Sequence, residues 1–245
     1  SSAASKFSLN KVKVDVEAPK VNREQILKNL EESRLARESS KFDNYLRKEY
    51  AQQGKYFAER ISWGDGKYAY LSKDIDKATG KPTPVRYRSY LKADGSIDWP
   101  LENGFVLDSA GNPVTQSANL KAGQVIDRFG NSYGRFTSPV DNGEKLAFNT
   151  RGLPYPEGYQ EYHQYEVVKD INKANYEKAY NQLNDMDKSQ LKMDMEEFGF
   201  RPEDIYNPQR GEISKIFGQG GGIQIQLGTS VNWYEKLGFL REVKK

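Results

Sequence analysis

The spacing of apolar side chains divides the chain into a helical N-terminal stretch and a longer region of short strands. Between residues 22 and 61, apolar side chains such as Leu27 and Leu30 recur at helical spacing, which predicts one long helix or a pair of helices. Asn22 and Gln25 carry the side chains of a capping box at the start of this stretch. We expect its many charged residues to form a face toward solvent.

Beyond Trp63, turn sequences such as WGDGK and KADGS separate short aromatic or β-branched runs. This alternation is typical of strands joined by hairpins. The runs predicted to be strands are KYAYL, VRYRSYL and residues 124–129, 134–137, 163–168, 222–227 and 240–243.

Residues 172–198 differ from this pattern of short strands and turns, because their apolar residues again recur at helical spacing. A second start at Asp187, with Gln190 at the capping-box position, and a stop at Gly199 predict two helices inserted between strands. The fold class is therefore expected to be α+β, with a small mixed or antiparallel sheet, a helical N-terminal region and a helical insertion.

Three regions follow from these patterns. Residues 1–21 are rich in small and polar side chains and are expected to be a flexible arm or linker. Residues 22–92 form a helical and hairpin region whose role the sequence does not indicate. Residues 93–245 are expected to form one compact domain.

Composition narrows the chemistry. Lysine and arginine number 37 against 34 aspartate and glutamate residues, a bias too weak to predict nucleic acid as a partner. The chain has no cysteine and one histidine, which excludes thiolate nucleophiles and His-rich metal centres, and we expect no required metal. No apolar run approaches the roughly 20 residues of a membrane span, so membrane insertion is not expected.

The first chemical cluster surrounds one tight turn at residues 126–139. Arg128 and Arg135 lie close to Phe129 and Phe136 in this segment, with glycines between them. An arginine can bind phosphate oxygens with two donors, and an aromatic ring can stack on a base. Such a hairpin could hold a dinucleotide; the alternative is an ordinary hairpin with exposed arginines.

Arg151 and His163 stand alone in their segments. Arg151 is placed where glycine and proline bend the chain. His163 lies at the head of a predicted strand, where it could donate a hydrogen bond or carry a proton. A purely structural histidine is the alternative.

The sequence FGQGGGIQIQL carries the densest glycine run in the chain. Gly221 and Gly222 would let backbone pass close to a ligand, and Gln224 and Gln226 project to one face of the strand that follows. A glutamine face suits hydrogen bonding to a ribose or an amide. The alternative is a flexible loop that leads into a half-buried edge strand.

The pieces DWPLENGF, VIDRFGNSYGRFTSP, RGLPY, YHQYEV, FGQGGGIQ and LREV occur in this order over residues 98–243. As an ordered set they resemble the tuberculosis necrotizing toxin domain. Members of that family are NAD+ glycohydrolases, usually C-terminal domains of secreted bacterial toxins, each neutralised by a specific immunity protein. Secreted fungal relatives exist as well.

The resemblance implies that residues 93–245 cleave NAD+, and by extension NADP+, to nicotinamide and ADP-ribose without a cofactor. It also implies a fold distantly like that of ADP-ribosyltransferases. The chain is then expected to be a secreted or delivered toxin fragment that depletes the dinucleotide in the cytosol of a target cell. An immunity protein is the expected partner.

The resemblance assigns the site position by position. The catalytic residues are expected to be Arg128, Phe136, Arg151, His163 and Gln224, and the further substrate-binding residues Tyr133, Arg135, Thr137, Gly221 and Gly222. The two catalytic arginines would anchor the phosphates or position the ribose, and Phe136 would pack on nicotinamide or its ribose. Gln224 would form a hydrogen bond near the reacting carbon, and His163 would have an orienting role. The stretch between His163 and Gln224 is longer than in the family because of the helical insertion.

Three other functions remain open at this point. An ADP-ribosyltransferase would pass ADP-ribose to an acceptor, and a non-catalytic binding module would bind nucleotide or protein without consuming NAD+. A nuclease toxin is disfavoured because the chain has no pair of histidines or acidic metal-binding cluster in sequence.

Overall fold

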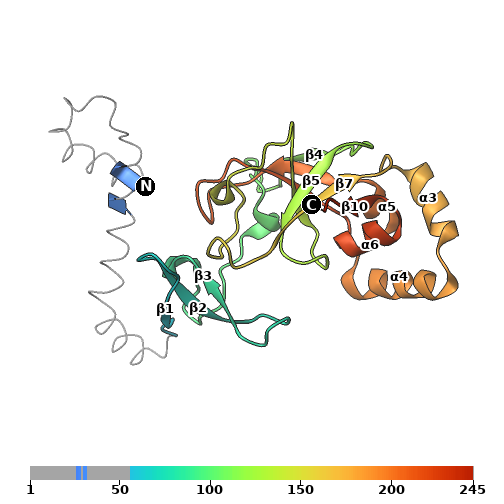
Figure 1. Cartoon of the computed structure of the whole chain (residues 1–245). Coiled ribbons are helices and arrows are strands. Elements are labelled where there is room, and N and C mark those ends of the chain that lie inside the picture. The colour runs from blue at the N-terminus through green and yellow to red at the C-terminus, as the bar shows by residue number, and fades with distance from the viewer. Residues whose placement is uncertain (1–25, 29, 32–55, 245) are drawn as a thin grey trace, which may run out of the picture. The chain divides into compact units, whose positions relative to one another are not determined.

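The computed structural model describes residues 26–28, 30–31 and 56–244. The chain divides into two compact units, Ser1–Ile97 and Asp98–Lys245, and each has its own sheet (Figure 1). Residues 26–28 and 30–31 are helical, while the rest of the predicted helical stretch up to residue 55 lies outside the described residues. In the described part of the chain, no helix is long and apolar enough to cross a membrane.

The first unit contains an antiparallel sheet of β1 (Arg60–Ser62), β2 (Tyr68–Ile75) and β3 (Pro82–Val85), in that order. The predicted helix end near Ile61 is wrong, because Ile61 lies in β1 opposite Ala69 of β2. The WGDGK turn folds the chain back, with Trp63 N donating to Lys67 O at 2.8 Å. Local hairpin pairing therefore replaces the helix there.

The predicted strand VRYRSYL is also wrong over most of its length. Only its first residue, Val85, belongs to a strand, and the 3-10 helix η2 (Arg88–Tyr90) follows. The Arg88 guanidinium lies 4.3 Å from the ring centroid of Phe57 and 5.2 Å from that of Tyr70. These cation–π contacts favour the turn over an extended course.

The second unit is built on a seven-stranded sheet in the order β10-β7-β5-β6-β9-β8-β4, in which all neighbouring strands are antiparallel. Its strands are β4 (Thr115–Ser117), β5 (Val125–Phe129), β6 (Phe136–Pro139), β7 (Tyr162–Val167), β8 (Gln209–Glu212), β9 (Ile223–Gln226) and β10 (Leu240–Glu242). The predicted α+β class and the five strands predicted after residue 120 are confirmed, with ends shifted by one or two residues.

Among the described residues, four α-helices follow or separate these strands: α3 (Lys173–Gln182), α4 (Asp185–Phe198), α5 (Pro202–Tyr206) and α6 (Val231–Lys236). The Asn172 side chain caps α3. Gly199 ends α4 in the left-handed conformation with φ 71°, as predicted for the stop. The predicted second start at Asp187 is wrong, because the Asn184 side chain accepts from Asp187 N and α4 begins at Asp185. The cap lies one turn earlier than the sequence pattern suggests.

The core lies on one face of this sheet, against the helices. Ile126, Tyr165 and Val167 are buried there with Leu191 of α4 and Tyr234 of α6. Side chains alternate along a strand, so the residues between them belong to the other face. That other face holds Asp127 and Gln224, whereas Arg128 shares the face of Ile126 at the end of β5.

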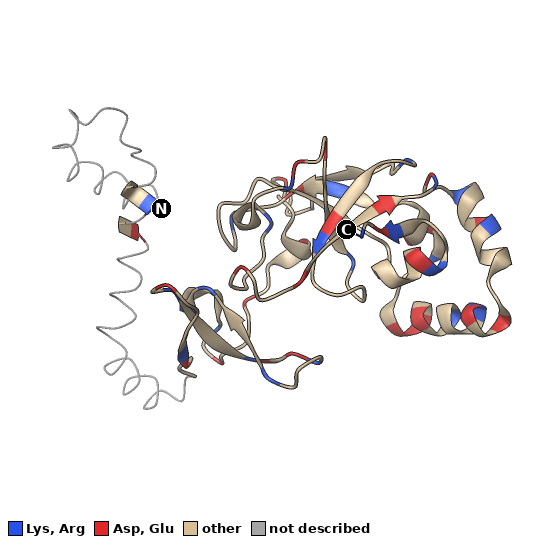
Figure 2. Cartoon of the chain, in the orientation of Figure 1, with Lys and Arg blue, Asp and Glu red and all other residues tan. Residues whose placement is uncertain are grey.

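Basic and acidic side chains are interspersed over both units and are not gathered by sign (Figure 2). Helix α4 carries charges of both signs, with Lys188 and Lys192 between acidic residues at its two ends. The mixed charges on the surface of the described residues agree with the small net charge of the whole sequence.

Candidate active site

A pocket of about 370 Å³ lies in the Asp98–Lys245 unit. Its walls are formed by Trp99, Pro100, Asn103, Gly104, Asp127, Arg128, Phe129, Phe136, Thr137, Ser138, Arg151, Gly152, Leu153, Tyr155, Gln160, Ile213, Ser214, Ile216, Phe217 and Gln224. Four of the five predicted catalytic residues are among them, and so is Thr137. Segments far apart in the sequence therefore meet at one cavity.

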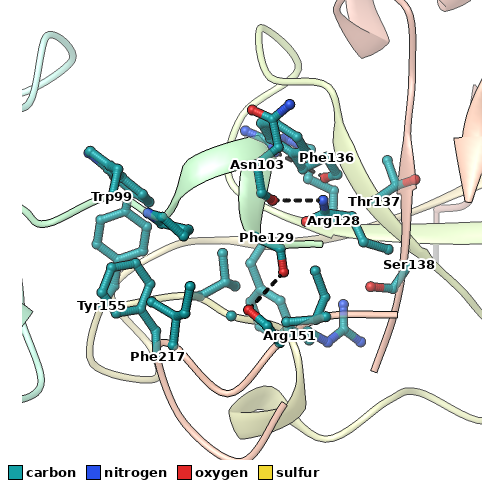
Figure 3. A pocket seen from close by; sticks show the side chains of 18 of the residues that line it. Trp99, Asn103, Arg128, Phe129, Phe136, Thr137, Ser138, Arg151, Tyr155 and Phe217 are labelled. Carbon is teal, nitrogen blue, oxygen red and sulfur yellow. Dashed lines mark hydrogen bonds between the residues drawn. The ribbon is translucent and has the colours of Figure 1, made fainter. Parts of the chain in front are cut away.

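The pocket has an aromatic end. The Trp99 ring meets Tyr155 and Phe217 edge to face, with ring centroids 6.1 and 5.8 Å apart, and Figure 3 shows the three rings gathered on one side. Phe217 is buried, whereas Trp99 keeps 50% of its surface exposed. A large exposed ring beside a cavity can stack on a flat base.

Arg128 lies at the opposite, polar end, close to Phe136 and Asn103 (Figure 3). Its Nε donates to Asn131 O at 2.7 Å and its Nη1 to Phe136 O at 3.1 Å. The guanidinium thus crosses the turn between β5 and β6, where a β-carbon on Gly134 would collide with it. Burial lowers the pKa of Arg128 from its ordinary value, yet this group stays charged at neutral pH.

Gln224 is placed by β9 on the pocket face and is 9% exposed. Its Nε2 donates to Asn103 O at 3.1 Å, and Asn103 Nδ2 donates to Gln226 Oε1 at 3.2 Å. Asn103 belongs to the short segment η3 (Leu101–Gly104) and has a φ of 57°. Nε2 uses one of its two hydrogens on this loop, so the carbonyl oxygen and the second N–H of the Gln224 amide are left for a ligand.

Arg151 is held in a buried network. Its Nη1 and Nη2 donate to Asp127 Oδ1 and Oδ2 at 2.6 and 2.8 Å, and its Nε and Nη2 donate to Leu146 O at 3.1 and 2.9 Å. Tyr162 donates its hydroxyl to Asp127 Oδ2 at 2.6 Å. The phosphate-anchoring role predicted for Arg151 does not fit this geometry, because its charge and most of its donors are already used.

Phe136 and Thr137 differ in what they offer the pocket. Phe136 is half-buried at the start of β6, and the Arg135 guanidinium lies 5.3 Å from its ring centroid. Thr137 donates its hydroxyl to Ile225 O at 2.8 Å. The threonine side chain therefore joins β6 to β9, and its hydroxyl hydrogen is not available to a substrate.

His163 is not among the residues that line the pocket. It lies on β7 directly opposite Arg128 of β5, but its Nδ1 is 2.7 Å from Glu242 of β10 and its Nε2 is 3.3 Å from Glu161. The orienting role predicted for it does not fit this arrangement, since both nitrogens face carboxylates. The imidazole instead joins β7 to the edge strand β10.

Tyr133 and Arg135 also lie outside the pocket lining. Tyr133 is 77% exposed at the tip of the turn between β5 and β6. Burial lowers the pKa of Arg135 from its ordinary value, and the charge of Asp204 opposes that shift. Neither side chain is placed to touch a ligand in the pocket as it stands.

Gly221 and Gly222 approach protein backbone rather than the pocket. Gly221 N donates to Ile213 O at 2.8 Å and Gly222 N to Thr150 O at 3.0 Å. A β-carbon on Gly222 would lie 2.6 Å from Thr150 O. Gly222 is thus needed for packing against the segment that precedes Arg151, and Gly221 has a left-handed φ of 85°. The backbone N–H groups of both glycines bind protein oxygens in place of the predicted ligand.

Several pocket residues were not predicted as site residues from the sequence. Trp99 and Phe217 lie within motifs already recognised, DWPLENGF and FGQGGGIQ, so their aromatic character was the available signal. Asp127 adjoins Arg128, but its partner Arg151 is distant in sequence. Gln160 carries no local signal.

The chemistry that this pocket allows follows from its charges. Asp127 supplies the one carboxylate among the lining residues, and it is paired with Arg151. The remaining polar groups are the Arg128 guanidinium and amide or hydroxyl side chains. Such a site suits a ligand with flat rings and can stabilise a developing positive charge by oriented dipoles.

Residues 119–182 match the model of a family described as tuberculosis necrotizing toxin, which confirms the resemblance expected from the motifs. The matched segment contains Arg128, Phe136, Arg151 and His163, while Gln224 lies beyond it.

A curated relative, the conidial surface nicotinamide adenine dinucleotide glycohydrolase nadA of Aspergillus fumigatus, is 33% identical over 96 residues. The match covers 35% of this chain and 38% of that protein, so the chain spans well under half of the relative's length. Among solved structures, tuberculosis necrotizing toxin complexed with its immunity factor aligns over 70% of this chain and 79% of that chain, at 17% identity and a TM-score of 0.39.

Proposed function

We propose that the Asp98–Lys245 unit, which carries a domain of the tuberculosis necrotizing toxin family over residues 119–182, hydrolyses NAD+ to nicotinamide and ADP-ribose. The observation that carries the proposal is the pocket, which combines an aromatic end with Arg128, Phe136 and Gln224 at a polar end. The identity with a protein named as an NAD glycohydrolase supports it.

In this proposal the dinucleotide lies along the pocket. The adenine ring stacks on Trp99, whose exposed surface suits a base. The nicotinamide and its ribose lie beside Phe136 and Gln224, and Arg128 binds oxygens of the linking phosphates or ribose. Arg151 contributes indirectly, because its pair with Asp127 fixes the floor of the pocket.

Cleavage breaks the bond between the ribose C1′ and the pyridinium nitrogen, and the bonding electrons leave with nicotinamide. The leaving group is then neutral, so no general acid is needed, and the ribose becomes oxocarbenium-like. The carbonyl dipole of Gln224 stabilises that positive charge. Water attacks C1′ and releases its proton to solvent, which gives ADP-ribose.

The test is incubation of the full chain with NAD+ in the absence of any acceptor protein, followed by chromatography. The proposal expects nicotinamide and free ADP-ribose in equal amounts. ADP-ribose attached to a protein would identify an ADP-ribosyltransferase instead. Bound but unconsumed NAD+, with the fold intact by circular dichroism, would identify a binding module.

From the family match we further propose that the chain cleaves NADP+ as well as NAD+ and that a specific immunity protein neutralises it. We also propose that it is delivered as a secreted toxin and acts in the cytosol of a target cell. Parallel assays with NADP+ test the first. Expression of the chain in the cytosol of a host cell tests the toxic action, with the NAD+ content of the cells and their growth as the measurements.

A further inference from the structure

The pocket contains an amide oxygen that has no hydrogen-bond partner. Gln160 lines the cavity, and its Oε1 is buried without a donor among the described residues. An unsatisfied buried acceptor costs free energy, so such an atom in a binding pocket points to a donor supplied by a ligand. Rotation about the last bond of the side chain is soft, and it can turn this oxygen toward the cavity.

Arg128 borders the same space. A β-carbon built on Gly130 would lie 2.8 Å from Arg128 Nη2 and 3.2 Å from Gln160 Nε2. Arg128 uses Nε and Nη1 for the backbone oxygens of Asn131 and Phe136. Across the described part of the chain, Nη2 donates to no protein acceptor, so it is available beside the Gln160 amide.

We propose that Gln160 and Arg128 together recognise a planar group of the substrate that presents an amino donor beside an acceptor. Gln160 Oε1 accepts from the amino group and Arg128 Nη2 donates to the neighbouring acceptor. NAD+ carries this chemistry in the carboxamide of nicotinamide, which lies at this end of the pocket in the proposed pose, and in the amino edge of adenine, which would lie here if the dinucleotide ran in the opposite direction. Arg128 has five N–H groups and uses two on backbone oxygens, so others stay available for phosphate or ribose oxygens. The inference rests on the proposed function and makes Gln160 a specificity-determining residue.

The test measures kcat/KM of the full chain for three substrates: NAD+, acetylpyridine adenine dinucleotide and nicotinamide hypoxanthine dinucleotide. The second replaces the carboxamide amino group by methyl, and the third replaces the adenine amino group by oxygen. Each is assayed with the wild type and with Gln160→Met, which keeps the side-chain length and removes the amide. Gln116→Met, an exposed change on β4, is the matched control.

Gln160→Met is expected to lower kcat/KM for NAD+ about five- to tenfold, the effect of one neutral hydrogen bond. It should leave unchanged the kcat/KM of whichever analogue lacks the amino group that Gln160 binds. An unchanged value for the acetylpyridine analogue identifies the carboxamide, and one for the hypoxanthine analogue identifies adenine. Gln116→Met should match the wild type throughout.

An equal loss on all three substrates, or no loss on any, overturns the inference. A wild type that leaves all three intact overturns the proposed function instead. The same comparison is then made with dissociation constants from calorimetry, so the role of Gln160 is decided in either case.

Discussion

Arg151 and Asp127 form a two-pronged ion pair beneath the pocket, with N–O distances of 2.6 and 2.8 Å and side chains that are 4% and 0% exposed. The Tyr162 hydroxyl completes the network on Asp127. Asp127 comes from β5 and Arg151 from the end of η4 (Phe148–Thr150). The pair therefore holds a loop against the sheet at the point where the pocket floor lies.

Arg151→Ala should lower the free energy of unfolding by about 3–5 kcal/mol, because it leaves the buried Asp127 carboxylate without its cation. Urea denaturation measures the change. Arg241→Ala is the control, since the pair of Arg241 with Glu166 is exposed and should contribute about 1 kcal/mol or less. Undiminished stability of Arg151→Ala with a raised KM would show that Arg151 contacts substrate directly.

Gln224→Ala should lower kcat for NAD+ by about 10² or more, with the fold intact, because the amide dipole beside the reacting carbon is lost. Initial rates of nicotinamide release measure the effect. Gln116→Ala on β4 serves as the control. Near-normal turnover of Gln224→Ala would remove Gln224 from the mechanism.

Trp99→Ala should lower kcat/KM for NAD+ roughly 10- to 100-fold, in keeping with about 1–3 kcal/mol for stacking of a base on an aromatic ring. Hydrolysis of nicotinamide mononucleotide, which has no adenine, should not change. Leu101→Ala is a nearby control, as Leu101 is 80% exposed and does not line the pocket. Equal losses on both substrates would place adenine elsewhere.

The hydroxyl of Tyr162 gives a pH-dependent stability. Burial and the hydrogen bond to Asp127 raise its pKa to about 12, whereas a tyrosine in the unfolded chain ionises at about 10. Its contribution to stability is thus complete below about pH 10 and is lost as the pH rises toward 12.

Tyr162→Phe should therefore lose less stability than the wild type between about pH 10 and 12. Urea denaturation across this range gives the difference between the two proteins. Tyr165 and Tyr176, whose pKa values burial also raises to about 12, contribute equally to both. Tyr133→Phe, at an exposed position, is the control, and parallel pH curves for Tyr162→Phe and wild type would contradict the prediction.

Local patterns were sufficient for much of the fold. Strand patterns located β5, β7 and β9, and the helical spacing of residues 172–198 with the stop at Gly199 located the inserted helices. The errors arose where a local pattern competed with a contact elsewhere. Ile61 continues an apolar helical spacing, but its pairing with Ala69 makes it a strand residue.

The site residues that could be predicted from the sequence are those that lie within single motifs. Arg128, Phe136 and Gln224 reach the pocket because strands β5, β6 and β9 are neighbours and carry them to it. The sequence could not reveal that Arg151 is neutralised by Asp127 or that His163 is taken by Glu242, because both partners are distant in the chain.

The glycine run also connects the two segments that carry Gln224 and Arg151. Gly220 and Gly222 donate to Asn149 O and Thr150 O, so the strand that presents Gln224 and the loop that presents Arg151 are joined by main-chain bonds. Replacing the side chain of Gln224 or Arg151 removes neither of these main-chain hydrogen bonds. These main-chain hydrogen bonds hold the strand of Gln224 at a fixed distance from the loop of Arg151, in addition to the Asp127–Arg151 ion pair.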